Sequence, residues 1–171
     1  MEKSKSLIAY FSRKGSNYVG GSIVNLPIGN TEVVANEIQE LTGSDMFEIK
    51  TVKSYPKDYT ETTNVAKEEL RENARPELTE KVDNMDSYDV IYIGYPNWWG
   101  TMPMAVYTFL ESYDFSGKTI IPYCTHEGSG MGSSERDIKK FSPNAKVMSG
   151  LAIKGSTVKN AAGTIKSWIS Q

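Results

Sequence analysis

Two adjacent tryptophans, Trp98 and Trp99, stand between Pro96 and Gly100 in the stretch GYPNWWGT. Neighbouring side chains on a strand point to opposite faces, so the pattern favours burial of at most one indole. Exposed indoles are suited to stacking on a flat aromatic ligand, which contributes about 0.5–1.5 kcal/mol beyond the area buried. The alternative is that one indole fills a gap against the following helix and the other is incidental.

A second stretch with binding chemistry, SRKGSNYVGGSIVNLPIGNT, follows the apolar run at 6–11. It ends where a helical pattern begins, and the free N–H groups and the dipole at a helix start favour an anion. Ser12, Asn30 and Thr31 can add side-chain hydrogen bonds to a phosphate. Two objections stay open. Asn30 or Thr31 is merely the N-cap of that helix, and Glu32 disfavours a dianion unless its side chain points away.

The third stretch, THEGSGMGSS, follows the apolar run at 118–124. Its glycines allow the backbone to approach a ligand closely, and Thr125 and the loop N–H groups can bond a polar edge. The GSGMGS segment has the wrong final spacing for a dinucleotide-binding fingerprint. A lone loop histidine such as His126 is more often solvated than catalytic. Cys124, at a strand end, is more typical of a buried small residue than of a reactive thiol.

The elements that must position these stretches follow from the apolar pattern. Apolar runs lie at 6–11, 46–52, 89–95 and 118–124, with a weaker run at 146–153. The first, third and fourth are nearly continuous, which is typical of strands buried on both faces. Helical patterns occupy the segment that ends at Gly43, then residues 61–74, a segment from Pro103 to Leu110, and residues 158–169.

This alternation predicts a single α/β domain over residues 1–171, with a parallel sheet covered by helices on both faces. Ligands of such sheets bind at the carboxyl ends of the strands, where the strand order reverses. The anion site, the stacking site and the polar-edge site therefore meet at one place. Together they describe a ligand with a phosphate, an aromatic ring system and a hydrogen-bonding rim, as in flavin mononucleotide (FMN).

At the stretch YPNWWGTMP the sequence resembles a bacterial flavodoxin-like branch of the flavodoxin family, and the resemblance covers essentially the whole chain. It implies a five-stranded sheet in the order 2-1-3-4-5 with FMN at the switch point. It also implies that FMN contacts come from the phosphate loop, the ring loop and the pyrimidine-edge loop. These are Ser12, Lys14, Asn30 and Thr31; Pro96, Asn97, Trp98, Trp99 and Gly100; and Thr125, Glu127 and Gly128.

The chain departs from this family at the phosphate loop, which usually runs from its Ser to Gly-Asn-Thr within about six residues. Here Gly15 is followed by SNYVGGSIVNLPI before Gly29 restores the pattern, so either Lys14 and Gly15 or Gly29 alone carries the phosphate turn. The insertion, residues 16–28, alternates in polarity and contains a Gly-Gly pair, which favours a small hairpin. Because it is apolar and uncharged, we expect it to cover the mouth of the crevice. Packing on the outside of the domain or against a second subunit is the alternative.

Composition limits the other classes of function. The 171 residues carry a net charge of -2 and one cysteine, so neither a basic nucleic-acid surface nor an internal disulfide is expected. The apolar run near the N-terminus is too short for a signal peptide or a membrane span, which favours the cytoplasm. A phosphorylated receiver module is excluded, because it needs acidic residues after the first strand and an Asp closing the third.

The expected function is that of a redox protein that transfers electrons through bound FMN, with no catalytic side chain or metal site assigned. An FMN-dependent NAD(P)H or quinone reductase is the alternative. Electron carriers tend to be strongly acidic, and the net charge of -2 decides little between the two. The expected partners are redox proteins or a small-molecule electron acceptor, with neither nucleic acid nor membrane, and a homodimer is left open.

Overall fold

The computed structural model describes residues 5–171, and a mostly buried parallel sheet forms its centre. The strands lie in the order β4 (Asp45–Glu48), β1 (Ser6–Tyr10), β5 (Val90–Pro96), β6 (Thr119–His126) and β7 (Lys146–Val147). A further strand, β8 (Leu151–Lys154), also pairs with β6 in parallel. With β7 and β8 counted as the fifth strand, this is the predicted order 2-1-3-4-5.

The fifth strand differs from the expected continuous run at 146–153. It is divided into β7 and β8, which pair with opposite ends of β6. Gly150 lies in the gap between them, where an added Cβ would be 2.5 Å from Cε of Met131 and 3.0 Å from the Pro122 carbonyl oxygen. Glycine allows the chain to pass this close to Pro122 and Met131. The weaker apolar pattern reflects two short pairings with β6 rather than one strand.

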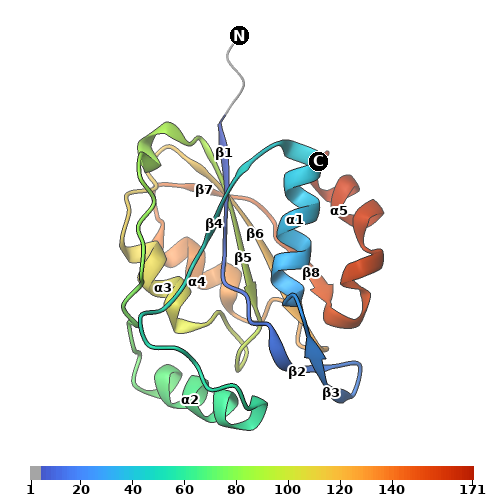
Figure 1. The fold of residues 1–171 in the computed structure, drawn as a ribbon. Helices are drawn as coiled ribbons and strands as arrows, with labels where there is room; N and C mark the ends of the chain where they lie inside the picture. The colour runs from blue at the N-terminus through green and yellow to red at the C-terminus, as the bar shows by residue number, and fades with distance from the viewer. Residues whose placement is uncertain (1–4) are drawn as a thin grey trace.

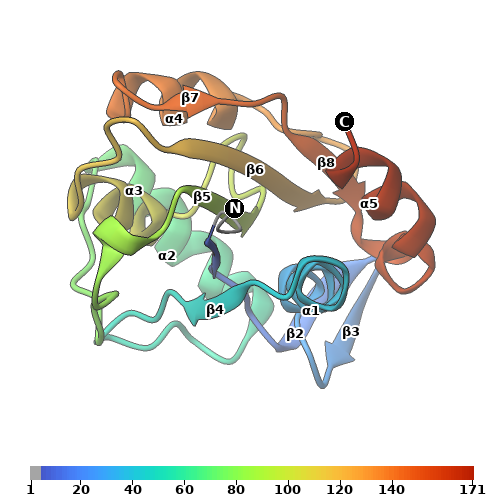
Figure 2. The same ribbon diagram turned by 90° about the horizontal axis from the view of Figure 1, so that it is seen from above.

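Helices cover both faces of the sheet (Figures 1 and 2). Helices α1 (Asn30–Thr42) and α5 (Ala162–Ile169) pack with a core that includes Ile8 and Tyr10. Helix α3 (Met104–Glu111) and helix α4 (Ser134–Phe141) pack with the core on the other face, which includes Leu7 and Ala9. Successive residues of β1 thus enter opposite cores, as the uninterrupted apolar pattern predicts.

Three of the predicted helices are confirmed. Helix α1 ends at Gly43, whose φ of 71° is the left-handed conformation that glycine adopts freely. Helix α2 (Tyr59–Arg71) begins at Asp58, whose carboxylate accepts a hydrogen bond from the Glu61 N–H. Helix α3 begins directly after Pro103. The α2 segment starts two residues before the predicted 61–74 and ends earlier.

Two helical predictions need correction. Helix α4 was not predicted: only Ile138 and Phe141 among its eight residues are apolar, so the segment contains no apolar run that stands out in the sequence. The last predicted helix, 158–169, is divided into a 3-10 helix, η2 (Gly155–Asn160), and α5. Val158, Ala161, Ile165 and Trp168 are buried as expected, whereas Ala162 is exposed.

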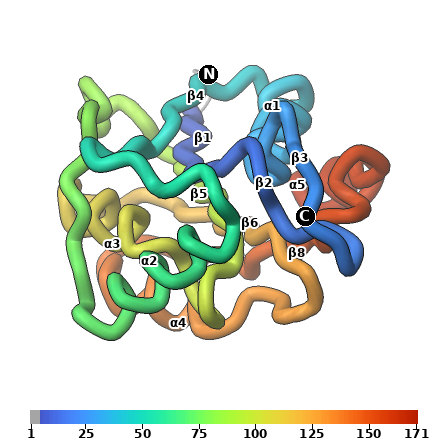
Figure 3. Tube along the Cα trace, turned by 60° about the horizontal axis from the view of Figure 1, so that its bottom comes forward, coloured from blue at the N-terminus to red at the C-terminus, as the bar shows by residue number. Residues whose placement is uncertain are grey.

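The insertion forms the predicted hairpin. Strands β2 (Gly15–Val19) and β3 (Ser22–Leu26) pair in antiparallel register and make a sheet of their own. The connecting residues, Gly20 and Gly21, both have positive φ, the conformation that a tight two-residue hairpin turn requires. The hairpin lies at the end of the domain where α1 begins, with its turn directed toward η2 (Figures 1 and 3).

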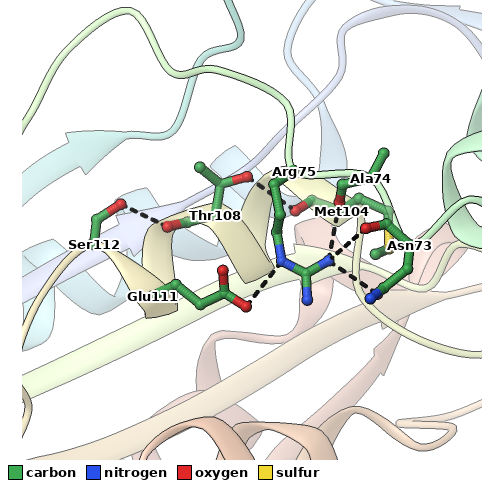
Figure 4. Close-up of polar contacts among 7 residues, drawn as sticks. All are labelled: Asn73, Ala74, Arg75, Met104, Thr108, Glu111 and Ser112. Carbon is green, nitrogen blue, oxygen red and sulfur yellow. Dashed lines mark hydrogen bonds and ion pairs between the residues drawn. The ribbon is translucent and has the colours of Figure 1, made fainter.

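The C-terminal end of α2 is fixed to α3 by Arg75 (Figure 4). The Arg75 Nε donates to a Glu111 carboxylate oxygen at 2.9 Å, and its Nη1 donates to the carbonyls of Asn73 and Ala74. The guanidinium also lies 5.2 Å from the ring centre of Tyr107. These contacts hold α2 beside the sheet end, where its other end meets the hairpin. Within residues 5–171, no helix is both long and apolar enough to cross a membrane.

Candidate functional site

A cavity of about 530 Å³ lies at the carboxyl ends of β1, β5 and β6. Strands β4 and β5 lie on opposite sides of β1, so this is the point at which the strand order reverses. Its walls come from the loops after β1, β5 and β6, from the hairpin and from one face of α2. The lining residues are Ser12, Arg13, Asn17, Tyr18, Leu26, Asn30, Thr31, Tyr59, Thr62, Thr63, Ala66, Pro96, Asn97, Trp98, Trp99, Gly100, Thr125, His126, Glu127 and Ser129.

The N-terminus of α1 opens onto this cavity. Gly29 is the N-cap, and no side chain on the helix caps it. Instead the Ser12 hydroxyl accepts the Glu32 N–H at 3.1 Å. A Cβ on Gly29 would lie 2.2 Å from the Ser12 oxygen, so the close approach of the two loop ends requires glycine. Asn30 and Thr31 are the first helical residues, and the reading that one of them is merely the N-cap is wrong.

The Glu32 carboxylate is turned away from the cavity. The Tyr10 hydroxyl donates to it at 3.2 Å, and Glu32 does not line the cavity. Burial, together with Glu48 and Glu32, raises the pKa of Tyr10, which keeps this hydroxyl protonated as a donor. The objection that Glu32 would repel an anion therefore falls away.

Two buried hydroxyls connect the loop after β1 with the end of β6. The Thr31 and Thr125 oxygens lie 2.8 Å apart, and both residues are almost fully buried. One hydroxyl donates to the other, so the acceptor's own proton is free to point elsewhere. Since both residues line the cavity, the pair can present one O–H donor to a ligand.

Tyr123 holds the start of α1 against the sheet. Its hydroxyl donates to the Thr31 carbonyl at 3.3 Å, and the residue is fully buried. The ring crosses Gly94, where a Cβ would lie 2.0 Å from the ring carbon that carries the hydroxyl. The absence of a side chain at Gly94 therefore leaves the space through which Tyr123 of β6 reaches α1. Sequence reasoning missed both roles, although a glycine within an apolar strand is a recognised signal of close approach.

The tryptophan pair is divided between core and surface. Trp98 is partly buried, with its ring edge-on to Phe11 and Tyr55 at 5.1 Å in both cases. Trp99 is 51% exposed, and its Nε1–H donates to the Thr63 carbonyl of α2 at 2.9 Å. Both line the cavity, and because Trp98 is only partly buried and Trp99 is exposed, the prediction that at most one indole is buried is confirmed. The alternative placed one indole in a gap against the following helix, whereas the aromatic contacts of Trp98 are with Phe11 and Tyr55.

The turn that carries the indoles is backbone-strained. Trp98 and Thr101 exchange two backbone hydrogen bonds, and the central residues have positive φ, 57° at Trp99 and 85° at Gly100. Glycine takes this conformation freely, but for a bulky residue it is rare and costly. Strain of this kind persists where the surroundings impose it. Here the turn is held by the hydrogen bond of Trp99 to the Thr63 carbonyl and by that of the Gly100 N–H to Asn97.

The loops after β5 and β6 form one hydrogen-bonded unit. The Asn97 side chain donates to the Gly130 carbonyl at 2.8 Å and accepts the Gly100 N–H at 2.9 Å. The Ser133 N–H donates to the Gly100 carbonyl at 2.9 Å. Gly132 lies so close that a Cβ would be 2.0 Å from the Gly100 oxygen. The glycines of this loop were expected to let the backbone approach a ligand. Gly132 instead lets the backbone approach the neighbouring loop, at the Gly100 carbonyl.

Two titratable side chains at the end of β6, Cys124 and His126, have pKa values shifted toward their uncharged forms. Burial raises the pKa of Cys124 to about 12, which makes it the inert buried thiol that the sequence favoured. Burial lowers the pKa of His126, with Glu127 opposing and Lys154 assisting the shift. The neutral His126 ring accepts the Gly128 N–H at Nδ1. His126 lines the cavity, so it is not simply solvated.

Ten of the twelve expected binding residues line the cavity, and two do not. Lys14 is exposed where the chain turns into β2, so the alternative that Lys14 and Gly15 carry the phosphate turn is not supported. The Gly128 N–H is engaged by His126, and Gly128 lies outside the lining. Gly29 instead packs closely on Ser12 at the start of α1.

Helix α2 is the wall that sequence reasoning missed. Its cavity face consists of Tyr59, Thr62, Thr63 and Ala66. The apolar residues of this segment are few, and of these Leu70 is exposed, whereas the polar Thr62 is buried. The face is too polar to show a hydrophobic period. The N-cap signal at Asp58, three residues before Glu61, was the available clue to the start of this helix.

Comparison with known proteins agrees with this arrangement. The family model described as flavodoxin matches residues 5–171. The chain belongs to the flavodoxin family. None of the curated proteins compared matches it.

Solved structures of proteins described as flavoproteins share the fold. A candidate flavoprotein from Bacteroides eggerthii is 27% identical with a TM-score of 0.78, covering 98% of this chain and 97% of its own. A second, from Bacteroides uniformis, is 29% identical with a TM-score of 0.77, covering 99% and 100%. A Lactobacillus acidophilus flavoprotein solved in complex with FMN is 22% identical, with a TM-score of 0.68, covering 92% and 98%.

Proposed function

We propose that this chain binds one FMN in the cavity and transfers electrons through it. The observation that carries the proposal is that a single cavity unites a helix N-terminus, two tryptophans and the loop after β6. Its volume of about 530 Å³ falls within the roughly 300–1,000 Å³ typical of ligand pockets. The family membership and the FMN complex of the Lactobacillus acidophilus flavoprotein support this choice of cofactor.

The residues present fit the phosphate of FMN. The free N–H groups at the start of α1 attract an anion, and the Thr31–Thr125 pair can donate one further hydrogen bond. With Glu32 turned toward Tyr10, the first turn of α1 directs no carboxylate into the cavity. We assign Ser12, Asn30 and Thr31 to phosphate binding on this basis.

The opposite wall fits a flat ring. Trp98 and Trp99 line the cavity from a turn whose backbone is anchored by Asn97. When bound, the flavin ring supplies the redox chemistry, and the protein orients it and tunes its electronics. The Trp98 indole is held by Phe11 and Tyr55, which fixes its plane before a ligand arrives. The Asn97–Gly130 and Ser133–Gly100 bonds keep the backbone of the ring loop from shifting freely.

An electron carrier with protein partners is the function we favour, and the cytoplasm is its proposed location. One assay distinguishes this electron carrier from the alternative, an FMN-dependent NAD(P)H or quinone reductase. A reductase oxidises NAD(P)H without a partner protein, with or without an added quinone, whereas a carrier does not. The first measurement is the visible spectrum of the purified protein, followed by titration of the apoprotein with FMN and with riboflavin.

Flavin fluorescence tests the placement of the ring. An indole within stacking distance quenches the emission of bound FMN, so Trp98→Phe and Trp99→Phe are compared with Trp168→Phe. Trp168 contacts Tyr92 and Tyr123 in the core on the other face and is the matched control. We expect emission to rise in at least one of the first two variants and to stay unchanged in the third. Equal emission from all three, or no binding of FMN by the native chain, would overturn the assignment.

A further inference from the structure

The β2–β3 hairpin is attached to the rest of the domain along β2 and at its turn. The Tyr18 ring of β2 stacks on Tyr59 of α2, with the ring centres 6.3 Å apart. At the turn, the Gly20 N–H donates to the Glu127 carboxylate at 3.1 Å. Asn17 and Tyr18 line the cavity, so this side of the hairpin forms part of the cavity wall.

The other side of the hairpin, strand β3, is uncovered. Residues 22–25 are all exposed, including Ile23 at 54% and Val24 at 36%. Among the described strands β3 pairs with β2 alone. Figures 1 and 2 show β3 at the outer edge of the domain. The hairpin therefore presents one apolar strand edge to the surroundings.

The register of the hairpin determines which backbone groups on this edge are unpaired. Two residues connect the strands, so Val19 and Ser22 form the first hydrogen-bonded pair. Hydrogen-bonded and non-hydrogen-bonded pairs alternate along an antiparallel ladder, so the N–H and C=O groups of Ile23 and Asn25 point away from β2. No backbone group elsewhere in residues 5–171 bonds to them.

The sequence of β3 contains nothing that blocks this edge. Edge strands are usually protected by charged side chains, proline or a bulge. The outer strands of the central sheet follow this rule, since β4 contains Asp45 and Glu48, β7 contains Lys146 and β8 contains Lys154. Residues 15–31, by contrast, include no charged residue, and β3 includes no proline. The edge of β3 is therefore open to pairing with another strand.

We propose that β3 pairs in antiparallel orientation with β3 of a second copy of this chain, with the two-fold axis at Val24. In this register Ile23 faces Asn25 of the second copy, and the outward groups of the two such pairs form four backbone hydrogen bonds. Val24 faces Val24 of the second copy as the non-hydrogen-bonded pair between them, in which Cα atoms lie about 4.5 Å apart. The inference does not depend on FMN binding.

A second copy fits this edge because the unpaired groups are complementary to themselves. A two-fold interface uses the same patch on both copies, so a charge near the axis would meet its own like charge. The uncharged segment 15–31 avoids this repulsion. The assembly also ends at two copies, because β2, on the other side of the hairpin, lies against α2. The contact is small, so we expect a weak dimer with a Kd of about 100 μM.

Sedimentation equilibrium between about 1 μM and about 1 mM protein measures the association. The variants Val24→Lys and Val24→Glu each place two like charges opposite one another, which destabilises a strand pair. An equimolar mixture of the two variants places Lys opposite Glu. Val52→Lys, at a position that is 57% exposed and outside the hairpin, is the matched control. Circular dichroism and melting temperature establish that each variant folds.

We expect each Val24 variant alone to dimerise at least about tenfold more weakly than the native chain. The mixture should recover dimerisation, as a heterodimer, and Val52→Lys should match the native chain. Recovery in the mixture shows that the single variants are folded and that position 24 faces itself.

Oxidative cross-linking tests the register independently. The native Cys124 is buried, so an added cysteine at the edge is the accessible thiol. Val24→Cys should form a disulfide-linked dimer, because the expected Cα separation lies within the range that a disulfide spans. Asn25→Cys should cross-link far less, because each Asn25 faces Ile23 of the second copy.

Three results would overturn the pairing. The first is native protein that stays monomeric at about 1 mM, and the second is a native dimer that both Val24 variants and their mixture leave unchanged. The third is equal cross-linking of Val24→Cys and Asn25→Cys, which would contradict the axis at Val24. None of these results bears on FMN binding, which the flavin titration decides separately.

Discussion

The hydroxyl pair formed by Thr31 and Thr125 makes a prediction that concerns stability and binding together. Valine has nearly the shape of threonine without its hydroxyl, so Thr31→Val removes one partner of a buried hydrogen bond and little else. Thr125 is 4% exposed, and among the described residues its hydroxyl bonds to Thr31 alone. The single change therefore leaves a buried hydroxyl unsatisfied.

The expected cost follows from that isolation. A buried polar group that loses its partner costs about 1–3 kcal/mol, whereas replacing both partners by apolar groups of the same shape is nearly neutral. Thr31→Val and Thr125→Val should each destabilise the apoprotein by about 1–3 kcal/mol. The double variant should be destabilised by much less than the sum. In a chain of this size each kcal/mol shifts the melting temperature by roughly 2–4 °C.

The same variants report on phosphate binding. In each single variant the remaining hydroxyl is free to donate to the phosphate, so FMN should recover stability that riboflavin does not. The double variant has no donor at this position. It should bind FMN more weakly by about 1.5–3 kcal/mol, the usual contribution of a hydrogen bond to a charged group, and riboflavin unchanged.

The assays are urea unfolding of the four apoproteins and titration of each with FMN and riboflavin. Unchanged m-values would establish that the native and unfolded states stay comparable. A double variant as unstable as the sum of the singles would refute the coupling between the hydroxyls. Equal loss of FMN and riboflavin would place the pair away from the phosphate.

Three further predictions concern the loops. Trp99→Asn should raise the stability of the apoprotein modestly, because Asn tolerates positive φ better than Trp, and it should weaken FMN binding. Urea unfolding and flavin titration measure these two effects, and a lower stability would argue against strain at this turn. Gly132→Ala should destabilise the apoprotein by about 1–3 kcal/mol, because its Cβ would overlap the Gly100 carbonyl. Gly163→Ala is the control, since its added Cβ has open space around it, and equal melting temperatures of the two variants would contradict this contact. His126 has a lowered pKa in the folded state, so the unfolded state binds more protons as the pH falls through about 6.5, and stability present above that pH should be lost below it. Between pH 7 and 5 the melting temperature should fall less steeply with pH in His126→Gln than in the native chain. Parallel profiles of the two proteins would show that the ring does not contribute.

Much of the fold could be predicted because its signals are local. The continuous apolar runs of β1, β5 and β6 reflect strands buried on both faces, and the Gly-Gly pair in the insertion reflects a turn with positive φ. The elements that the sequence did not predict correctly have weak local signals. Helix α4 has only two apolar residues, Ile138 and Phe141, and the division of the fifth strand occurs at Gly150, which lies close to Pro122 and Met131, residues distant in sequence.

The sequence by itself determined which loops meet, because the carboxyl ends of parallel strands share one edge. The sequence alone therefore predicts that Ser12, Asn30 and Trp98 lie at one cavity, without information on side-chain contacts. It could not determine how these side chains are arranged, since that depends on packing between segments far apart in the chain. Only the tertiary structure placed Glu127 on the hairpin turn and α2 in the wall.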